Sequence, residues 1–299
     1  MFKNLIIYRI TDTWDTDLAK IEENLKSMPF MPCGATQDTS MGWAPPRGQA
    51  HGALVESVAG QWILRLQVET KILPSSVVKR RAEERAQQIE GASGKKLSRM
   101  AVKDLREQTM MELLPRAFTK LASVPVWIDP EAKLVMIEAA SPAKADEVAV
   151  LLLSSLDGLA ISPLQTQKSP TTCMSAWLHS FDPPHRFGID RECELKAIDE
   201  TQAIVRYARH NIEIEEVKRH IQNGKMATKL ALTWADRVSF MLTETLQIKK
   251  IKLLEAVMEG NESQDEGEDH FDGDVAIMTG ELAKMIPDMI EALGGELVE

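Results

Sequence analysis

Residues 73–121, LPSSVVKRRAEERAQQIEGASGKKLSRMAVKDLREQTMMELLPRAFTKL, decide the fold, because their helical periodicity interrupts strand-like sequence on both sides. The pattern predicts helices over 77–90 and 97–121, joined by the loop GASG at 91–94. The first helix has few apolar positions and cannot bury much surface. We therefore expect a long helical hairpin that projects into solvent.

The same stretch is the most basic part of the chain. Between residues 71 and 121, twelve Lys and Arg residues stand against six acids. Five of these cations are candidate phosphate contacts: Lys71, Lys79, Arg80, Arg116 and Lys120. Many charged surfaces only keep a protein soluble, so this pattern alone leaves both phosphate binding and solubility open as interpretations.

The sequence on either side of the hairpin is rich in short apolar runs. Those at 2–10, 54–58 and 62–68 are typical of strands, and a helix is expected over 12–27. Two further strands are expected after the hairpin, at 124–128 and 134–138, and Ser141-Pro142 begins another helix. We expect 1–72 and 122–165 to share one sheet as a discontinuous central α/β domain, with 73–121 inserted as a tip domain.

Residues 166–299 are predicted to form a third, C-terminal α/β (base) domain. Alternating apolar residues indicate strands at 187–195, 203–209, 225–234, 237–242 and 247–253. A Leu, Met and Ile stripe indicates a last helix that ends at Gly294-Gly295. The expected class is α+β with mixed or antiparallel sheets.

A second group of cations lies in this base domain. Lys225 and Lys229 are expected to project from one face of strand 225–234, with Arg206 and Arg209 close by on the preceding strand. Aromatic residues make up only 5% of the 299 residues. Contact with a phosphate backbone is therefore favoured over stacking on unpaired bases.

The formal net charge of −10 does not exclude a polyanionic partner, because the acidity is local. Nine acids and no Lys or Arg lie between Glu255 and Asp274, and without these acids the formal charge would be −1. No apolar run approaches the ~20 residues that cross a bilayer, and the first residues resemble a strand more than a signal peptide. We expect a cytoplasmic protein with no membrane partner.

No catalytic site, metal site or cofactor is predicted. The three cysteines, Cys33, Cys173 and Cys193, form no Cys-x-x-Cys pair, and the six histidines are scattered. No phosphate-binding glycine loop occurs. The acidic loop at 255–274 could hold a divalent cation but lacks the calcium-loop pattern, so a solvated loop is favoured.

Eight short strings, in order along the chain, carry a family resemblance. They are FKNL (2–5), PCG (32–34), MGW (41–43), KILP (71–74), LLPRAF (113–118), WID (127–129), TKLAL (228–232) and MTGEL (278–282). With these strings the chain resembles the RdgC family of bacterial recombination-associated proteins over essentially its full length. The resemblance implies a homodimer closed into a ring around duplex DNA without sequence preference, associated with the nucleoid. It also implies restraint of the RecA recombinase, with single-stranded DNA as a further possible ligand.

The resemblance also implies roles for individual residues. It places the contact that closes the ring at Phe118, expected at the end of the second hairpin helix, although a core aromatic beside Leu114 and Leu121 fits the same residue. It places DNA contacts at Arg209 and His210, where His210 departs from the family's basic or amide pattern. The last helix and the second-half strands are expected to form the other dimer contact.

Two alternatives from other functional classes stay open. One is a metal-dependent nuclease that uses the acidic loop, and the other is an interaction scaffold that touches no DNA. We expect a DNA-binding protein that is not an enzyme.

Overall fold

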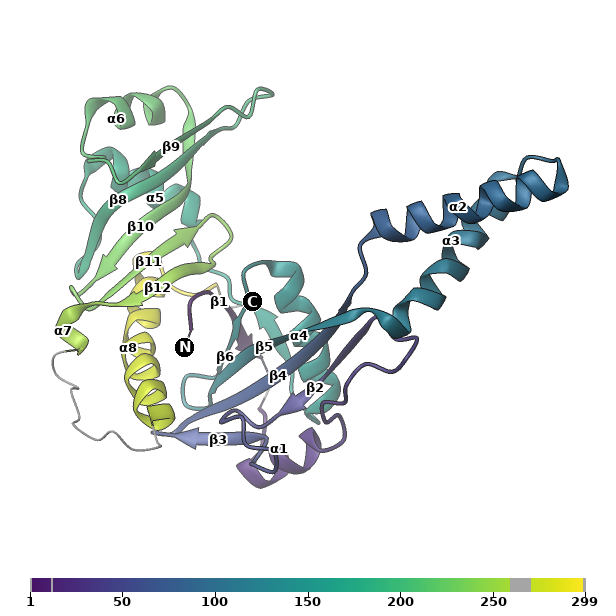
Figure 1. Cartoon of the computed structure of the whole chain (residues 1–299). Helices are drawn as coiled ribbons and strands as arrows, with labels where there is room; N and C mark the ends of the chain where they lie inside the picture. Colours follow the sequence, from purple (N-terminus) through teal and green to yellow (C-terminus); the bar gives the residue numbers. More distant parts are fainter. Residues whose placement is uncertain (1, 12, 259–269, 298–299) are drawn as a thin grey trace.

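The computed structural model describes residues 2–11, 13–258 and 270–297. Within these ranges the chain is α+β and is built on one large antiparallel sheet (Figure 1). The strands are β1 (Leu5–Ile10), β2 (Thr39–Ala44), β3 (Val55–Val58), β4 (Gln61–Ile72), β5 (Phe118–Asp129), β6 (Leu134–Glu138), β7 (Ile161–Pro163), β8 (Phe187–Ala197), β9 (Ile204–Ala208), β10 (Lys225–Trp234), β11 (Val238–Thr243) and β12 (Ile248–Leu253). The predicted α+β class is confirmed.

The helices lie on the faces and at the ends of this sheet. They are α1 (Leu18–Leu25), α2 (Ser75–Ser93), α3 (Arg99–Leu113), α4 (Pro142–Ser155), α5 (Pro170–Ser180), α6 (Glu215–Gln222), α7 (Glu255–Met258) and α8 (His270–Ala292). Among the described residues, no helix has both the length and the apolar composition needed to cross a membrane.

Strand β1 joins the two halves of the sheet. The strand order is β2-β4-β5-β6-β1-β12-β11-β10-β8-β9, with β3 beside β4 and β7 beside β1. Leu5 is opposite Glu138 of β6 on one side and opposite Ile248 of β12 on the other. The strands from the two ends of the sequence therefore form one hydrogen-bonded unit.

The side chains of β1 alternate between two apolar cores. Leu5 and Ile7 belong to a cluster that includes α8, while Tyr8 and Ile10 belong to a second cluster with α1 and α4. This alternation is the period of two expected of a strand that is covered on both faces.

Helix α8 contributes the clearest apolar stripe. Leu282, Met285, Ile286 and Met289 are all at most 1% exposed. The helix ends as predicted, where Gly294 and Gly295 adopt positive φ and the N–H of Gly295 donates to the carbonyl oxygen of Ile290. Because this stripe is buried inside the chain, the expectation that the last helix forms a dimer contact is wrong for these residues.

Helices α2 and α3 form an arm, residues 75–113, that projects from the sheet (Figure 1). They pack against each other, and their fully buried residues are only Ala82 and Thr109. Arg85 of α2 forms an ion pair with Glu112 of α3 across the arm. Little apolar surface holds the arm to the rest of the molecule.

Two predicted helix limits are wrong. Helix α3 ends at Leu113, not at residue 121, because Pro115 has no N–H to continue the helix; residues 114–116 form a 3₁₀ turn, and β5 begins at Phe118. Helix α1 covers 18–25 instead of 12–27. The domain limits 1–72 with 122–165, 73–121 and 166–299 stay a prediction, and most of the acidic loop lies outside the described residues.

Candidate nucleic-acid interface

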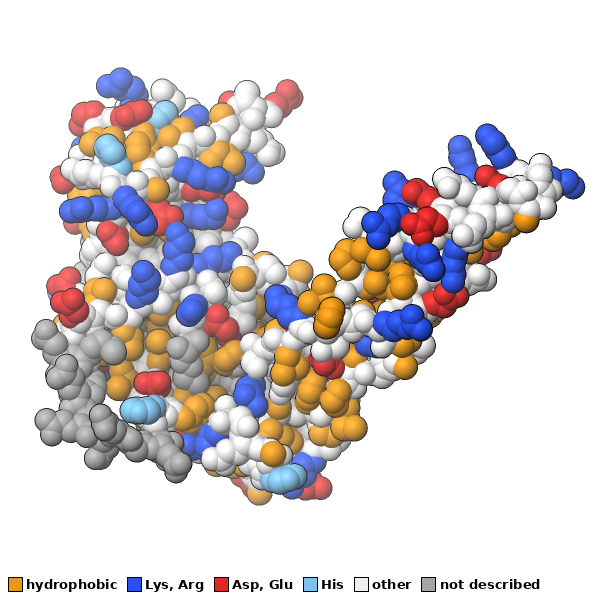
Figure 2. Space-filling model, viewed as in Figure 1, with side chains coloured by type: hydrophobic (Ala, Val, Ile, Leu, Met, Phe, Trp, Pro, Cys, Tyr) orange, Lys and Arg blue, Asp and Glu red, His pale blue; other side chains and the backbone are white. Residues whose placement is uncertain are grey.

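A groove of about 480 Å³ opens on β8–β12, on the face turned away from the core under α8. Four cations, Arg206, Lys229, Lys249 and Lys250, line it together with the carboxylates of Glu192 and Glu194. We call these six residues the basic groove. Figure 2 shows Lys and Arg side chains gathered over this part of the sheet and along the arm.

The register of the sheet explains why three of these side chains meet. Arg206 of β9 lies directly opposite Glu194 of β8, which lies directly opposite Lys229 of β10. Residues opposite each other in an antiparallel sheet project from the same face. The three charges therefore form a row across three strands.

Glu194 is the buried centre of this row, at 8% exposure. It accepts hydrogen bonds from Lys229 Nζ at 3.0 Å, from Thr228 Oγ1 at 2.9 Å and from Arg206 Nε. Burial by itself raises the pKa of Glu194, but the hydrogen bonds from Lys229, Arg206 and Thr228 outweigh it and hold the pKa below its usual range. The carboxylate is therefore ionised at neutral pH.

Lys249 and Lys250 of β12 complete the groove, and sequence reasoning did not single them out. Lys249 Nζ donates to the carbonyl oxygen of Ala140 at 2.9 Å, and Lys250 Nζ contacts Glu192 Oε1 at 2.6 Å. The signal that could have found them is KKIK at 249–252, a run of cations in a predicted strand.

Lys225 does not share a face with Lys229, which corrects the prediction. A β-bulge between Ala227 and Lys229 adds one residue to β10, so Lys225 is opposite Ala197 whereas Lys229 is opposite Glu194. Ala197 and Glu194 are an odd number of residues apart on β8 and project from opposite faces. The structure therefore separates the two lysines.

Arg209 and His210 follow β9 and are exposed. Arg209 has a positive φ of 56°, and the Nδ1 atom of His210 lies 2.6 Å from the carbonyl oxygen of Asn211. Both residues lie beyond the end of the strand that carries Arg206, and neither is among the residues that line the groove.

The predicted contacts on the arm and its root differ in accessibility. Lys79 and Arg80 lie on α2 and make long ion pairs with acids one turn away, at 3.8 and 3.9 Å. Arg116 and Lys120 are exposed beside the arm. Lys71 is different, because its Nζ donates to the carbonyl oxygens of Ala35 at 2.7 Å and Leu114 at 3.1 Å.

Phe118 is 85% exposed at the first position of β5, so the interpretation of this residue as a core aromatic is wrong. It is paired with Ile72 of β4, which is 52% exposed. Leu121 is also exposed, whereas Leu114 is buried. An apolar pair thus faces solvent where the arm leaves the sheet.

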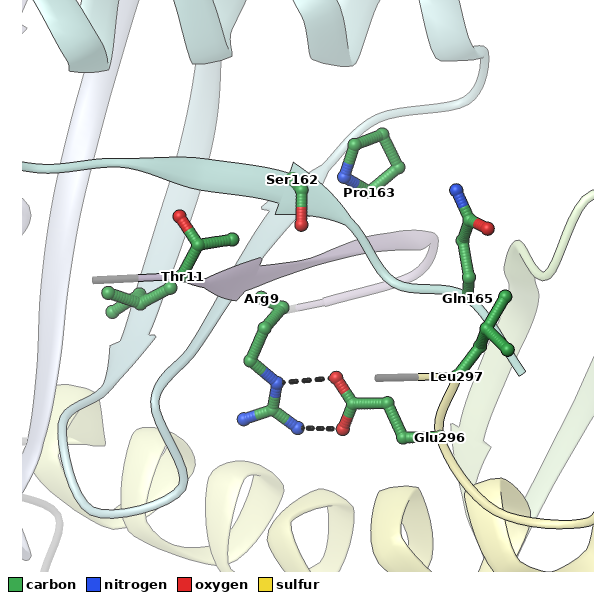
Figure 3. Close-up of a pocket in the computed structure, with 8 residues that line it drawn as sticks. Arg9, Thr11, Ser162, Pro163, Gln165, Glu296 and Leu297 are labelled. Atoms are coloured by element: carbon green, nitrogen blue, oxygen red, sulfur yellow. Dashed lines mark hydrogen bonds and ion pairs between the residues drawn. The ribbon is translucent and has the colours of Figure 1, made fainter. Parts of the chain in front are cut away.

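Another cavity, of about 520 Å³, lies away from the predicted site residues (Figure 3). It forms where β1 and β7 meet the segment after α8, and its main polar feature is the ion pair of Arg9 with Glu296. Arg9 also donates to the carbonyl oxygens of Ala132 and Lys133. The ion pair with Glu296 therefore joins the segment after α8 to β1, and the two carbonyl bonds occupy the rest of the guanidinium.

Among the residues that the structure describes, no three His, Cys, Asp or Glu side chains are grouped as metal ligands. Cys173 and Cys193 are buried free thiols, and burial raises the pKa of Cys193 to about 12. Residues 259–269 of the predicted acidic loop lie outside the described ranges.

The comparisons with known proteins agree with one another. The family model described as "Putative exonuclease, RdgC" matches residues 1–296. A protein of Dechloromonas aromatica named "Recombination-associated protein RdgC" is 46% identical over 100% of this chain and 99% of its own length. Proteins with the same name from Janthinobacterium sp. and Bordetella pertussis are 42% and 40% identical, each over 99% of this chain and 98% of their own length. The chain therefore belongs to the RdgC family of recombination-associated proteins.

Proposed function

We propose that this protein binds duplex DNA without sequence preference as a ring-shaped homodimer, and that it limits RecA-promoted recombination in the nucleoid by occupying DNA. The observation that carries the proposal is the basic groove, where four cations from β9, β10 and β12 line one depression. Phosphate contacts of this kind position a protein on DNA but carry no sequence information.

The shape of the chain supports a ring. Figure 2 shows the arm and the strands β8–β12 rising on two sides of an open angle, with cations on both. Two copies related by a twofold axis would enclose a basic space if each end met its own copy. At the arm, the exposed pair Phe118 and Ile72 offers an apolar contact; at the other end, edge strand β9 offers Ile204, which is 49% exposed.

A gel-shift titration with several unrelated duplexes of one length tests this function. We expect equal affinities and a steep loss of binding with salt, because each neutralised phosphate adds about −0.9 to the slope of log affinity against log salt. The double variant Lys249→Gln, Lys250→Gln should weaken binding to every duplex. It should also make the slope shallower by up to roughly 0.9 for each phosphate that the variant no longer neutralises.

The matched control is Lys26→Gln at the end of α1, where the side chain pairs with Glu23 one turn away and lies outside the groove. Its affinity and slope should equal those of the unmodified protein. A protein that binds no duplex even at low salt would contradict the proposal and favour the interaction scaffold. A strong preference for one duplex would contradict the lack of sequence readout.

The description of the family model supports a second candidate, an exonuclease. Incubation of end-labelled linear duplex with the protein and Mg²⁺ decides between the two: progressive loss of the labelled ends would establish the nuclease, and intact ends with a full gel shift would support binding alone.

A further inference from the structure

Glu194 is a negatively charged residue in the basic groove, although the proposed ligand of the groove, DNA, is itself negatively charged. A carboxylate at the centre of a DNA-binding surface should repel phosphate. Yet Glu194 is buried, ionised and bonded to the two cations beside it. Burial of a charge is costly unless it is paired, so the ionised Glu194 favours side-chain positions of Arg206 and Lys229 that keep both bonds.

The bonding to Glu194 leaves N–H donors of both cations available, because the Lys229 ammonium carries three and Arg206 uses only Nε. Arg206 bonds Glu194 through Nε, and within the described part of the chain neither of its Nη atoms has a hydrogen-bond partner. The Arg206 side chain is 67% exposed and that of Lys229 is 41% exposed, whereas that of Glu194 is only 11% exposed. The acid thus lies beneath two cations that face the groove.

Such an arrangement suits a tetrahedral anion. The Nη1 and Nη2 atoms of a guanidinium form a planar fork that binds two oxygens of one phosphate, and an ammonium supplies a further donor. The trio of Arg206, Glu194 and Lys229 keeps a net charge of +1. Lys249 and Lys250 of β12, which line the same groove, add to the positive potential.

We propose that Arg206 and Lys229 form a discrete subsite for one phosphate group of the DNA backbone, and that Glu194 is the positioning residue that holds both cations for it. The inference rests on the proposed function and adds a defined place and geometry to it. Free Arg and Lys side chains lose rotamer entropy when they bind, and Glu194 reduces that cost because it orders them beforehand.

Two isosteric variants separate positioning from charge. Glu194→Gln and Glu192→Gln each remove one negative charge from the same groove, so electrostatics alone predicts tighter DNA binding for both. Glu192 is 41% exposed and pairs with Lys250, whereas Glu194 holds two cations. We expect Glu192→Gln to tighten binding to a random-sequence duplex and Glu194→Gln to weaken it on the order of tenfold, the effect of ordering two long side chains.

A third variant guards against a folding defect in Glu194→Gln. Arg206→Lys keeps the charge on an exposed edge strand but removes both the Nε bond and the planar fork. It should weaken binding by a similar factor while the thermal melting temperature stays close to that of the unmodified protein. Inorganic phosphate should raise that melting temperature in the unmodified protein and less in Arg206→Lys and Glu194→Gln.

The outcomes are distinguishable. If the unmodified protein binds no duplex, the proposed function fails and the subsite fails with it. If the unmodified protein binds duplex while folded Glu194→Gln binds as tightly or more tightly, the subsite is overturned and the function stands. Should Glu194→Gln not fold, Arg206→Lys decides: undiminished affinity overturns the proposal, and a decrease on the order of tenfold supports it.

Discussion

Truncation of Phe118 should leave the fold intact and weaken the proposed ring. The side chain is 85% exposed, so Phe118→Ala removes little buried surface. Full burial of a phenylalanine contributes about 1.5–3 kcal/mol, so the small buried remainder corresponds to a decrease of about 0.5 kcal/mol or less in the free energy of unfolding. If the arms of two copies meet at Phe118 and Ile72, the same change would cost that interface about 2 kcal/mol or more.

Thermal melting and dissociation from circular plasmid measure the two effects separately. Phe118→Ala should melt almost as the unmodified protein does but leave closed circles faster, because a weaker interface opens more often. Val126→Ala on the same strand is the control: Val126 is fully buried, so it should lose about 2 kcal/mol of stability. A melting shift for Phe118→Ala as large as that of Val126→Ala, or unchanged dissociation from circles, would refute the reasoning.

Two further predictions concern the fold. A Cβ on Gly42 would lie 2.5 Å from the backbone of Phe30, so Gly42→Ala should lower the free energy of unfolding by about 1–3 kcal/mol in urea titrations. The control is Gly91→Ala in α2, where a Cβ meets nothing within 4 Å, and this change should be neutral or stabilising. Equal effects of the two substitutions would contradict the close approach of Gly42 to Phe30. Hydrogen bonds from Arg237 lower the pKa of buried Glu281. The ionised Glu281 therefore stabilises the fold above about pH 4.3, the usual pKa of a glutamate, and this stabilisation is lost as the pH falls below that value. Glu281→Gln should therefore flatten the fall of melting temperature between about pH 5 and pH 3, while exposed Glu23→Gln should not; parallel curves for all three proteins would rule out this linkage.

Elements with a long regular pattern were predictable from the sequence. The stripe of α8 and its glycine end follow from 3.6-residue periodicity and left-handed backbone, and both are observed. The end of α3 was misplaced because the apolar spacing of Leu114, Phe118 and Leu121 imitates a helix. Pro115 was the local signal against it, and pairing with β4 settles the strand.

The candidate site was less predictable, because it depends on register between strands. Alternation along 187–195 is enough to put Glu194 on the face opposite Cys193 and Leu195, but nothing local shows that Arg206 and Lys229 lie opposite it. The bulge that separates Lys225 from Lys229 leaves no mark in the sequence around Ala227. The sequence predicted Lys71 as a phosphate contact, whereas in the structure its ammonium donates to two backbone carbonyl oxygens.

The place of β1 between β6 and β12 constrains how the chain can fold during synthesis. On one side, Leu5 of β1 pairs with Ile248 of β12, and Ile248 is synthesised only after most of the chain has left the ribosome. Until then Leu5 and Ile7 lack the cover of α8, and one edge of β1 has no complete partner. Exposed apolar strand edges promote aggregation, and contacts between distant residues form slowly. A nascent chain of this protein should therefore need chaperone protection until residues beyond 248 emerge.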